Sequence, residues 1–95
     1  MENLNKVKSY FGLSVRARKV AIGTNEILEK DVFVIVASKS LSENAKNKIM
    51  NHIDRKKTKF FAISEEEMFS ITDNSNIFAF GIIDKGLANA IEKNI

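Results

Sequence analysis

Two short segments of the chain, residues 32–37 and 77–83, are apolar at alternate and at intervening positions alike. The first reads Val-Phe-Val-Ile-Val-Ala and the second reads Ile-Phe-Ala-Phe-Gly-Ile-Ile. A strand with one face in water alternates apolar and polar residues, so a strand without this alternation is buried on both faces. Both segments are therefore predicted to be interior strands of a sheet that helices cover on both sides.

The rest of the chain supplies the covering helices and the outer strands. Apolar residues at helical spacing predict helices over residues 2–12, 41–53 and 64–71 and after Asp84, a short helix fits residues 23–30, and two short strands fit residues 18–22 and 59–63. Helices that alternate with strands predict the α/β class, as a three-layer α/β/α sandwich around a mixed four-stranded sheet. The strand order stays open at this point.

Helix starts are marked by residues that can cap them. Residues 40–43 and 64–67 have the form of capping boxes, with a serine followed three residues later by a glutamate. Asp84 is placed to cap the last helix.

The length and composition narrow the class of protein. Residues 1–95 form one small domain, because single domains typically run about 100–150 residues. The absence of Cys excludes disulfides and zinc–thiolate sites, and the single His52 excludes a polyhistidine metal site. No apolar run approaches the about 20 residues of a membrane span, and residues 1–6 lack the apolar block of a signal peptide. We expect a monomeric, cytoplasmic protein without metal, cofactor or membrane association.

Charge is unevenly distributed along the chain. Residues 1–60 carry 13 Lys or Arg and 6 Asp or Glu, whereas residues 61–95 carry 2 and 6. This asymmetry predicts a basic face formed by the first two-thirds of the chain. Basic faces attract polyanions, nucleic acid first among them, although surface lysines also serve simple solvation.

Two groups that could carry catalysis have simpler explanations. Glu65, Glu66 and Glu67 directly follow Ser64, where acidic side chains stabilise the first turn of a helix, and consecutive residues fan around a helix rather than converge on one ion. His52 has no nucleophile at a readable spacing, so a structural histidine is favoured over a general base. No catalytic residue is assigned, and the protein is not expected to be an enzyme.

A cation cluster comprises Arg55, Lys56, Lys57 and Lys59. It could contact phosphates, or it could be the solvated end of a helix, where cations suit the negative end of the dipole. The second interpretation is favoured, because Asp54 interrupts the cluster and the aromatic residues after it fit a buried strand.

Residues 23–26, Gly-Thr-Asn-Glu, follow the basic residues Arg16, Arg18 and Lys19. Glycine allows close approach of another backbone, Asn25 offers a donor and an acceptor, and Glu26 offers two acceptors. A carboxylate suits base edges such as guanine N–H groups and not phosphates, so this combination indicates base recognition. An ordinary helix start is the alternative, because Thr, Asn and Glu are common there.

The order of these features resembles the kink-turn RNA-binding ribosomal-protein family, the L-seven-Ae and L-thirty-e proteins, and most closely its bacterial YlxQ-type branch. The resemblance covers nearly the whole chain. Its marks are residues 12–13 with 16–19, residues 23–26, residues 42–46 and residues 83–86, which read Gly-Leu, Arg-Ala-Arg-Lys, Gly-Thr-Asn-Glu, Ser-Glu-Asn-Ala-Lys and Ile-Asp-Lys-Gly.

The resemblance implies RNA binding without catalysis, in the cytoplasm and in association with ribosomal RNA or the ribosome. Asn25 and Glu26 would contact the tandem sheared G·A pairs of a kink-turn, with Gly23 and Thr24 against the backbone. The loop at residues 73–77, with Ser75, Asn76 and Ile77, would cover the extruded nucleotides of the bulge. The implied phosphate contacts are Arg16, Arg18, Lys19 and Lys30; Lys30 follows Glu29, which stands where the family usually has a lysine.

Two other functions remain open. The same fold could serve as a protein-interaction module on ribosomal or transcription machinery, without strong RNA affinity. It could also be a relative of the substrate domains of RNA methyltransferases, although 95 residues leave no room for the knotted cofactor domain.

Overall fold

The computed structural model describes residues 3–53 and 56–95. Helices and strands alternate along the chain, as the hydrophobic pattern predicts. In order they are α1 (Leu4–Arg16), β1 (Val20–Ile22), α2 (Thr24–Glu29), β2 (Val34–Ser38), α3 (Glu43–His52), β3 (Lys59–Ile63), α4 (Glu65–Thr72), β4 (Ala79–Ile82) and α5 (Lys85–Asn94).

The sheet has the order β1-β4-β2-β3, so β2 and β4 are its interior strands, as predicted. Strand β4 runs antiparallel to both β1 and β2, whereas β2 and β3 are parallel. Every residue of β2 and β4 is buried. The sheet is therefore mixed and four-stranded, and its interior strands are the two that lack polar alternation.

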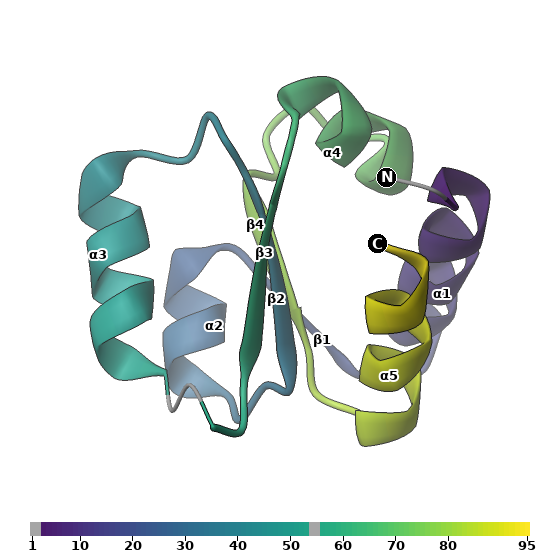
Figure 1. Ribbon diagram of the computed structural model, residues 1–95, viewed down its shortest axis with the longest axis horizontal. Coiled ribbons are helices and arrows are strands. Elements are labelled where there is room, and N and C mark those ends of the chain that lie inside the picture. The colour runs from purple at the N-terminus through teal and green to yellow at the C-terminus, as the bar shows by residue number, and fades with distance from the viewer. Residues whose placement is uncertain (1–2, 54–55) are drawn as a thin grey trace.

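Helices cover both faces of the sheet, with α2 and α3 on one side and α1, α4 and α5 on the other (Figure 1). The larger core lies under the three helices and includes Val7, Phe11, Met68 and Phe80. The smaller core lies under the two helices and includes Ile27, Ile35 and Ile49. This arrangement confirms the α/β/α sandwich.

Several predicted boundaries shift in the structure. Helix α1 was expected to end near Gly12 but continues to Arg16. Phe11 and Ser14 are buried on this helix, and the Ser14 hydroxyl donates to the carbonyl of Tyr10. A glycine inside a helix costs only about 1 kcal/mol, which this packing offsets. Strand β4 begins at Ala79, two residues later than predicted.

The two predicted capping boxes differ in outcome. At α4 the box is complete, because the Ser64 hydroxyl accepts from the N–H of Glu67 and the Glu67 carboxylate accepts from the N–H of Ser64. The hydrogen bond from the Ser64 N–H lowers the pKa of the Glu67 carboxyl below its usual value. At α3 the prediction was wrong: the cap is Ser42, whereas the Ser40 hydroxyl donates to Glu65. Asp84 caps α5 as predicted.

Gly81 in β4 lies where a larger residue would collide with the layer of α2 and α3. A Cβ at this position would be 2.9 Å from Cγ1 and 3.2 Å from Cβ of Val32, whose side chain is buried. We expect Gly81→Ala to lower the unfolding free energy by about 1–3 kcal/mol, measured by chemical denaturation. The loss should shrink when Val32 is also replaced by alanine.

Gly12 provides the matched control for this substitution. A Cβ there would meet its nearest atom, Nη1 of Arg16, at 3.5 Å, an ordinary van der Waals distance. Gly12→Ala should therefore stabilise the protein by about 0.5–1 kcal/mol, because alanine favours a helix interior. Equal effects of the two substitutions would contradict the collision with Val32.

Candidate functional site

The strand directions divide the sheet into two ends. Strands β1, β2 and β3 share one direction, because β1 and β2 are both antiparallel to β4 and β3 is parallel to β2. We call the end where these three strands finish, and where β4 starts, the carboxyl end. The opposite end, where they start and β4 finishes, is the amino end. The predicted site residues distribute between these two ends.

Gly23 stands at the carboxyl end, between β1 and α2. Its φ is 86°, in the region that favours glycine, and a Cβ there would meet nothing within 4 Å. Its N–H donates to the carbonyl of Ala79 at 2.9 Å, and its carbonyl accepts from the N–H of Ile27 at 3.1 Å. Ile27 is fully buried and anchors α2 to the core. Glycine is therefore required by the turn, and the turn is fixed to the start of β4.

The next three residues place polar groups at the surface. Thr24 is half-buried, whereas Asn25 and Glu26 are exposed. The Asn25 side chain makes no hydrogen bond to another described residue. Glu26 is paired with Lys30 one turn later at 3.4 Å, and both side chains are nearly half exposed. An exposed pair of this kind is worth at most about 1 kcal/mol, so Glu26 can exchange its partner at little cost.

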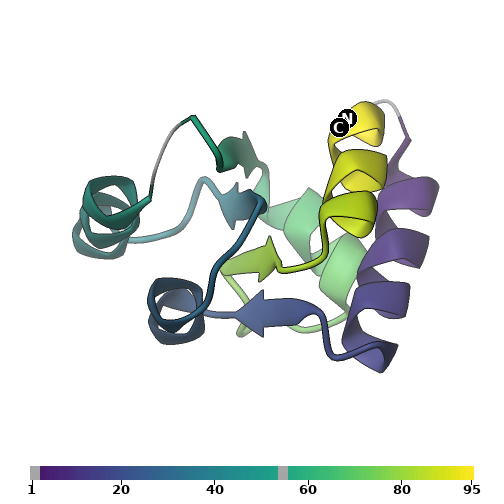
Figure 2. The same cartoon turned by 90° about the horizontal axis from the view of Figure 1, so that it is seen from below.

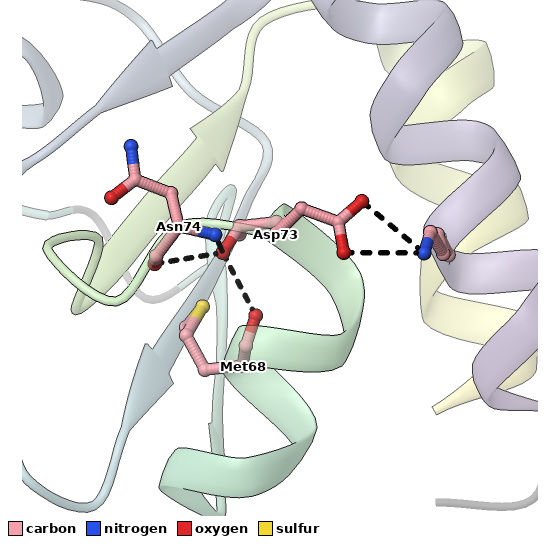
Figure 3. A network of polar contacts seen from close by, with 5 residues as sticks. Met68, Asp73 and Asn74 are labelled. Carbon is pink, nitrogen blue, oxygen red and sulfur yellow. Dashed lines mark hydrogen bonds and ion pairs between the residues drawn. The ribbon is translucent and has the colours of Figure 1, made fainter.

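The loop before β4 also lies at the carboxyl end and is held by hydrogen bonds (Figure 3). Asp73 takes a left-handed conformation with φ 55°, and Lys8 of α1 pairs with its carboxylate at 3.3 Å. The Thr72 hydroxyl joins the carbonyl of Met68 to the backbone of Asn74. The Asn74 side chain accepts from the N–H of Asn76 at 2.9 Å. The predicted turn is thus a preformed structure that exposes Ser75 and Asn76, whereas Ile77 is half-buried and packs against the larger core.

Two exposed phenylalanines stand beside these segments and were not predicted as part of a site. Phe78 is 38% exposed and directly precedes Ala79, the residue that binds the Gly23 N–H. Phe69 of α4 is 49% exposed and lines a hollow of about 580 Å³ together with residues of α4 and the loop, Asn74 and Ser75 among them. Both phenylalanines belong to apolar segments, so hydrophobic periodicity alone could not distinguish them from core residues.

Three of the four predicted phosphate contacts, Arg16, Arg18 and Lys19, lie apart from residues 23–26 and from the loop before β4. Lys19 precedes β1, and its carbonyl accepts from the N–H of Ile83, which follows β4. Lys19 therefore lies at the amino end, about 13 Å from Gly23 at about 3.3 Å per strand residue. Arg16 ends α1 and Arg18 follows it, so both lie on the side of Lys19. Lys30 follows the last turn of α2, but its ammonium reaches back to Glu26.

Arg18 is held in an unusual backbone conformation. Its φ is 57°, a left-handed value that favours glycine. The N–H of Lys19 donates to the carbonyl of Ser14, and the N–H of Arg18 donates to the carbonyl of Val15. These two hydrogen bonds form a Schellman motif, in which the left-handed position is usually occupied by glycine. The chain therefore keeps an exposed arginine where glycine would be the less strained residue.

The remaining sequence candidates are surface features. His52 is exposed near the end of α3, and Glu65 and Glu66 are exposed in the first turn of α4. Lys57 pairs with Asp31 and lies 5.4 Å from the ring centroid of Phe33. Arg55 of the predicted cation cluster lies outside the described residues. Within the described part of the chain no group of three or more His, Asp or Glu residues could hold a metal ion.

No helix of residues 3–53 and 56–95 is long and apolar enough to cross a membrane.

Comparison with known proteins identifies the fold. No protein-family model and no curated protein matches the chain. A solved protein with unknown function from Bacillus halodurans C is similar, with a TM-score of 0.76 and 17% identity over 93% of this chain and 94% of that one. The Giardia lamblia 15.5kD RNA binding protein is also similar, with a TM-score of 0.60 and 15% identity over 95% and 78%. At these identities the similarity establishes a shared fold.

Proposed function

We propose that this chain is a non-enzymatic RNA-binding protein that recognises structured, kink-turn-like RNA with the carboxyl end of its sheet. The observation that carries the proposal is the fixed turn at Gly23, which presents the exposed side chains of Asn25 and Glu26 beside the preformed loop before β4. The Giardia protein of the same fold is an RNA-binding protein, which supports RNA as the class of partner.

The carboxylates of the carboxyl end suit contact with base edges. Glu26, Glu43, Glu65 and Glu66 are exposed at or near this end, and the exposed Lys39 and Lys46 there offset part of their charge. Carboxylates accept hydrogen bonds from base N–H groups, and guanine presents such groups in a sheared G·A pair. In the proposed complex Asn25 and Glu26 contact base edges, while Gly23 and Thr24 lie against the RNA backbone.

The loop and the hollow beside it suit nucleotides that have left the helix. Extruded bases stack on exposed aromatic rings, and this end offers Phe69 and Phe78. Ser75, Asn76 and Ile77 would cover the extruded nucleotides of the bulge. Arg16, Arg18, Lys19 and Lys30 are the proposed phosphate contacts, and those on the far side of β1 would meet a different part of the RNA. Residues 1–95 would act as one monomeric domain, cytoplasmic and associated with ribosomal RNA or the ribosome.

The test is a titration against a kink-turn RNA with its G·A pairs intact and against the same RNA with those pairs replaced by Watson–Crick pairs. We expect about 10–100-fold tighter binding to the intact RNA, the scale of one or two base contacts. Affinity for both RNAs should fall as salt rises. Equal affinity for both RNAs would contradict the proposal that the protein recognises kink-turns. Absence of salt-dependent binding to either would favour a protein-interaction module instead.

A further inference from the structure

The amino end of the sheet brings together basic residues from separate parts of the chain. Lys19 leads into the edge strand β1, and Lys59 begins the other edge strand, β3. Backbone hydrogen bonds connect the row between them: Ile83 to Lys19, Phe33 to Ile82, and Lys59 to Phe33. At about 4.8 Å between neighbouring strands, Lys19 and Lys59 stand about 14 Å apart. The structure thus spaces cations across the whole width of the sheet.

Figure 2, which views the molecule from below, looks onto this end. The sequence analysis predicted a basic face formed by the first two-thirds of the chain alone. In the structure, Lys85 from the acidic last third also lies at this end, beside the basic residues of the first two-thirds. The described basic residues at or next to the amino end number eight: Arg16, Arg18, Lys19, Lys30, Lys56, Lys57, Lys59 and Lys85. The described acidic residues there number three: Glu29, Asp31 and Asp84.

Two of the acidic groups already have partners within the protein. Asp31 pairs with Lys57, and the Asp84 carboxylate accepts from the N–H of Leu87 at the start of α5. Arg18, Lys19, Lys59 and Lys85 form no ion pair with another described residue and are exposed. The described part of the amino end therefore has an excess of positive charge, because its eight Lys or Arg residues outnumber its three Asp or Glu residues.

The shape of the surface indicates the class of anion. The hollow at this end, lined by Lys30, His52 and Lys57 among others, has a volume of about 240 Å³. Small-molecule sites usually measure about 300–1,000 Å³. Four exposed cations stand outside the lining of this hollow: Arg18, Lys19, Lys59 and Lys85. Charges spread in this way suit a polymer with many phosphates better than one small anion.

Among its described residues, the amino end offers no free aromatic ring on which a base could stack, which favours contact with the backbone of a nucleic acid over contact with its bases. Phe33 is half-buried, and the ammonium of Lys57 lies 5.4 Å from its ring centroid. That face is thus occupied and offers no stacking platform to a base. Protein interfaces are depleted in lysine and centre on buried aromatic anchors, which this surface lacks. Arg18 adds a planar set of donors that matches phosphate geometry.

We propose that the amino end of the sheet is a second RNA-binding surface, which holds the sugar–phosphate backbone without reading bases. This inference deepens the proposed function, because it joins the proposed phosphate contacts Arg16, Arg18 and Lys19 with Lys59 and Lys85 in one separate surface at the end of the sheet opposite Asn25 and Glu26. It holds whether or not the carboxyl end recognises a kink-turn. A protein with both surfaces can hold two segments of one folded RNA.

The test uses the double variant Lys19→Glu with Lys59→Glu, titrated against a kink-turn RNA and against a plain RNA hairpin. We expect the affinity for both RNAs to fall by the same factor, about tenfold. The slope of the logarithm of the binding constant against the logarithm of the salt concentration should become less steep by about 1.5–2. The matched control is Lys6→Glu with Lys48→Glu, which makes the same charge change at exposed positions on α1 and α3. The control should retain most of the affinity.

The variant Arg18→Gly tests whether a loss of RNA affinity can occur without a loss of protein stability. Glycine relieves the left-handed conformation, so the thermal midpoint should be unchanged or higher. Affinity for both RNAs should nevertheless fall, with a less steep salt dependence. A variant that is at least as stable and yet binds more weakly assigns the loss to the arginine side chain.

The outcomes separate this inference from the proposed function. The proposal of a second surface would be overturned if the variant Lys19→Glu with Lys59→Glu had the same affinity as its control for both RNAs. Equally tight, equally lysine-dependent binding of poly-glutamate or of anionic phospholipid vesicles would overturn its assignment to RNA. Asn25→Ala and Glu26→Ala should weaken only kink-turn binding. If they change nothing while the lysine variant weakens both RNAs, the kink-turn proposal fails and the second surface stands.

Discussion

Replacing Phe80 by alanine is expected to lower the free energy of unfolding by about 3–5 kcal/mol, the usual cost of removing a fully buried aromatic ring. Phe80 lies in the interior strand β4, is fully buried, and its ring centroid is 4.7 Å from that of Phe11 on α1. It connects the sheet to the helical layer that contains α1. Domains are stable by only about 0.05–0.15 kcal/mol per residue, so this loss threatens folding at moderate temperature.

Chemical denaturation of Phe80→Ala and Phe69→Ala in parallel measures this effect. Phe69 is the same residue type but is about half exposed on α4, so its replacement should cost less than about 1 kcal/mol. If Phe80→Ala is too unstable to measure, Phe80→Leu provides a milder cavity at the same site. Equal costs for Phe80→Ala and Phe69→Ala would contradict the position of β4 in the interior of the sandwich.

The second large effect concerns Glu26. On a kink-turn RNA, Glu26→Gln and Glu26→Ala should each lose about 1–3 kcal/mol of binding free energy, because one good base contact is worth this much. Glutamine keeps the shape of the side chain but replaces one acceptor oxygen by a donor. The loss should shrink on an RNA whose G·A pairs are already replaced, since that RNA presents no matching guanine edge.

A double-mutant cycle between Glu26 and the G·A pairs isolates this interaction. Lys30→Ala tests the existing Glu26–Lys30 pair, because it frees the carboxylate without removing it. Since Lys30 is also a proposed phosphate contact, its loss of affinity should be the same for both RNAs and should show no coupling to the G·A pairs. An ordinary helix start predicts a small change in thermal stability and a coupling energy of zero. A site for phosphates predicts tighter binding to every RNA once the negative charge is gone. Either result, in a folded variant, would remove base recognition by residues 23–26.

Hydrophobic patterning predicted the layers of the fold because burial on both faces leaves a local mark. The segments at residues 32–37 and 77–83 could be recognised as interior strands for this reason, and β3 was predicted at its observed bounds. Capping residues mark helix starts just as locally, which is why Ser64 and Asp84 were predicted correctly. The end of α1 was not, because packing around Phe11 carries that helix past Gly12.

The candidate site was predictable only in part. The segment Gly-Thr-Asn-Glu is continuous, so its residues remain neighbours in any fold, and the positive φ of Gly23 follows from its turn. The exposure of Phe78 could not be predicted, because β4 begins only at Ala79 and leaves Phe78 just outside the buried strand. Apolar residues just before a strand and within it look the same in the sequence.

Which end of the sheet each charge occupies was decided by the tertiary structure. Lys19 and Gly23 are neighbours in sequence, yet β1 extends between them and separates them along the sheet. Lys19 and Lys59 are far apart in sequence, yet the antiparallel course of β4 and the parallel pairing of β2 with β3 place them at one end. The sequence by itself determined the layers, the interior strands and the polar segment at residues 23–26, because these depend on local patterns. Only strand order and direction, set by long-range backbone pairing, could place Lys19 and Lys59 at the end of the sheet opposite residues 23–26.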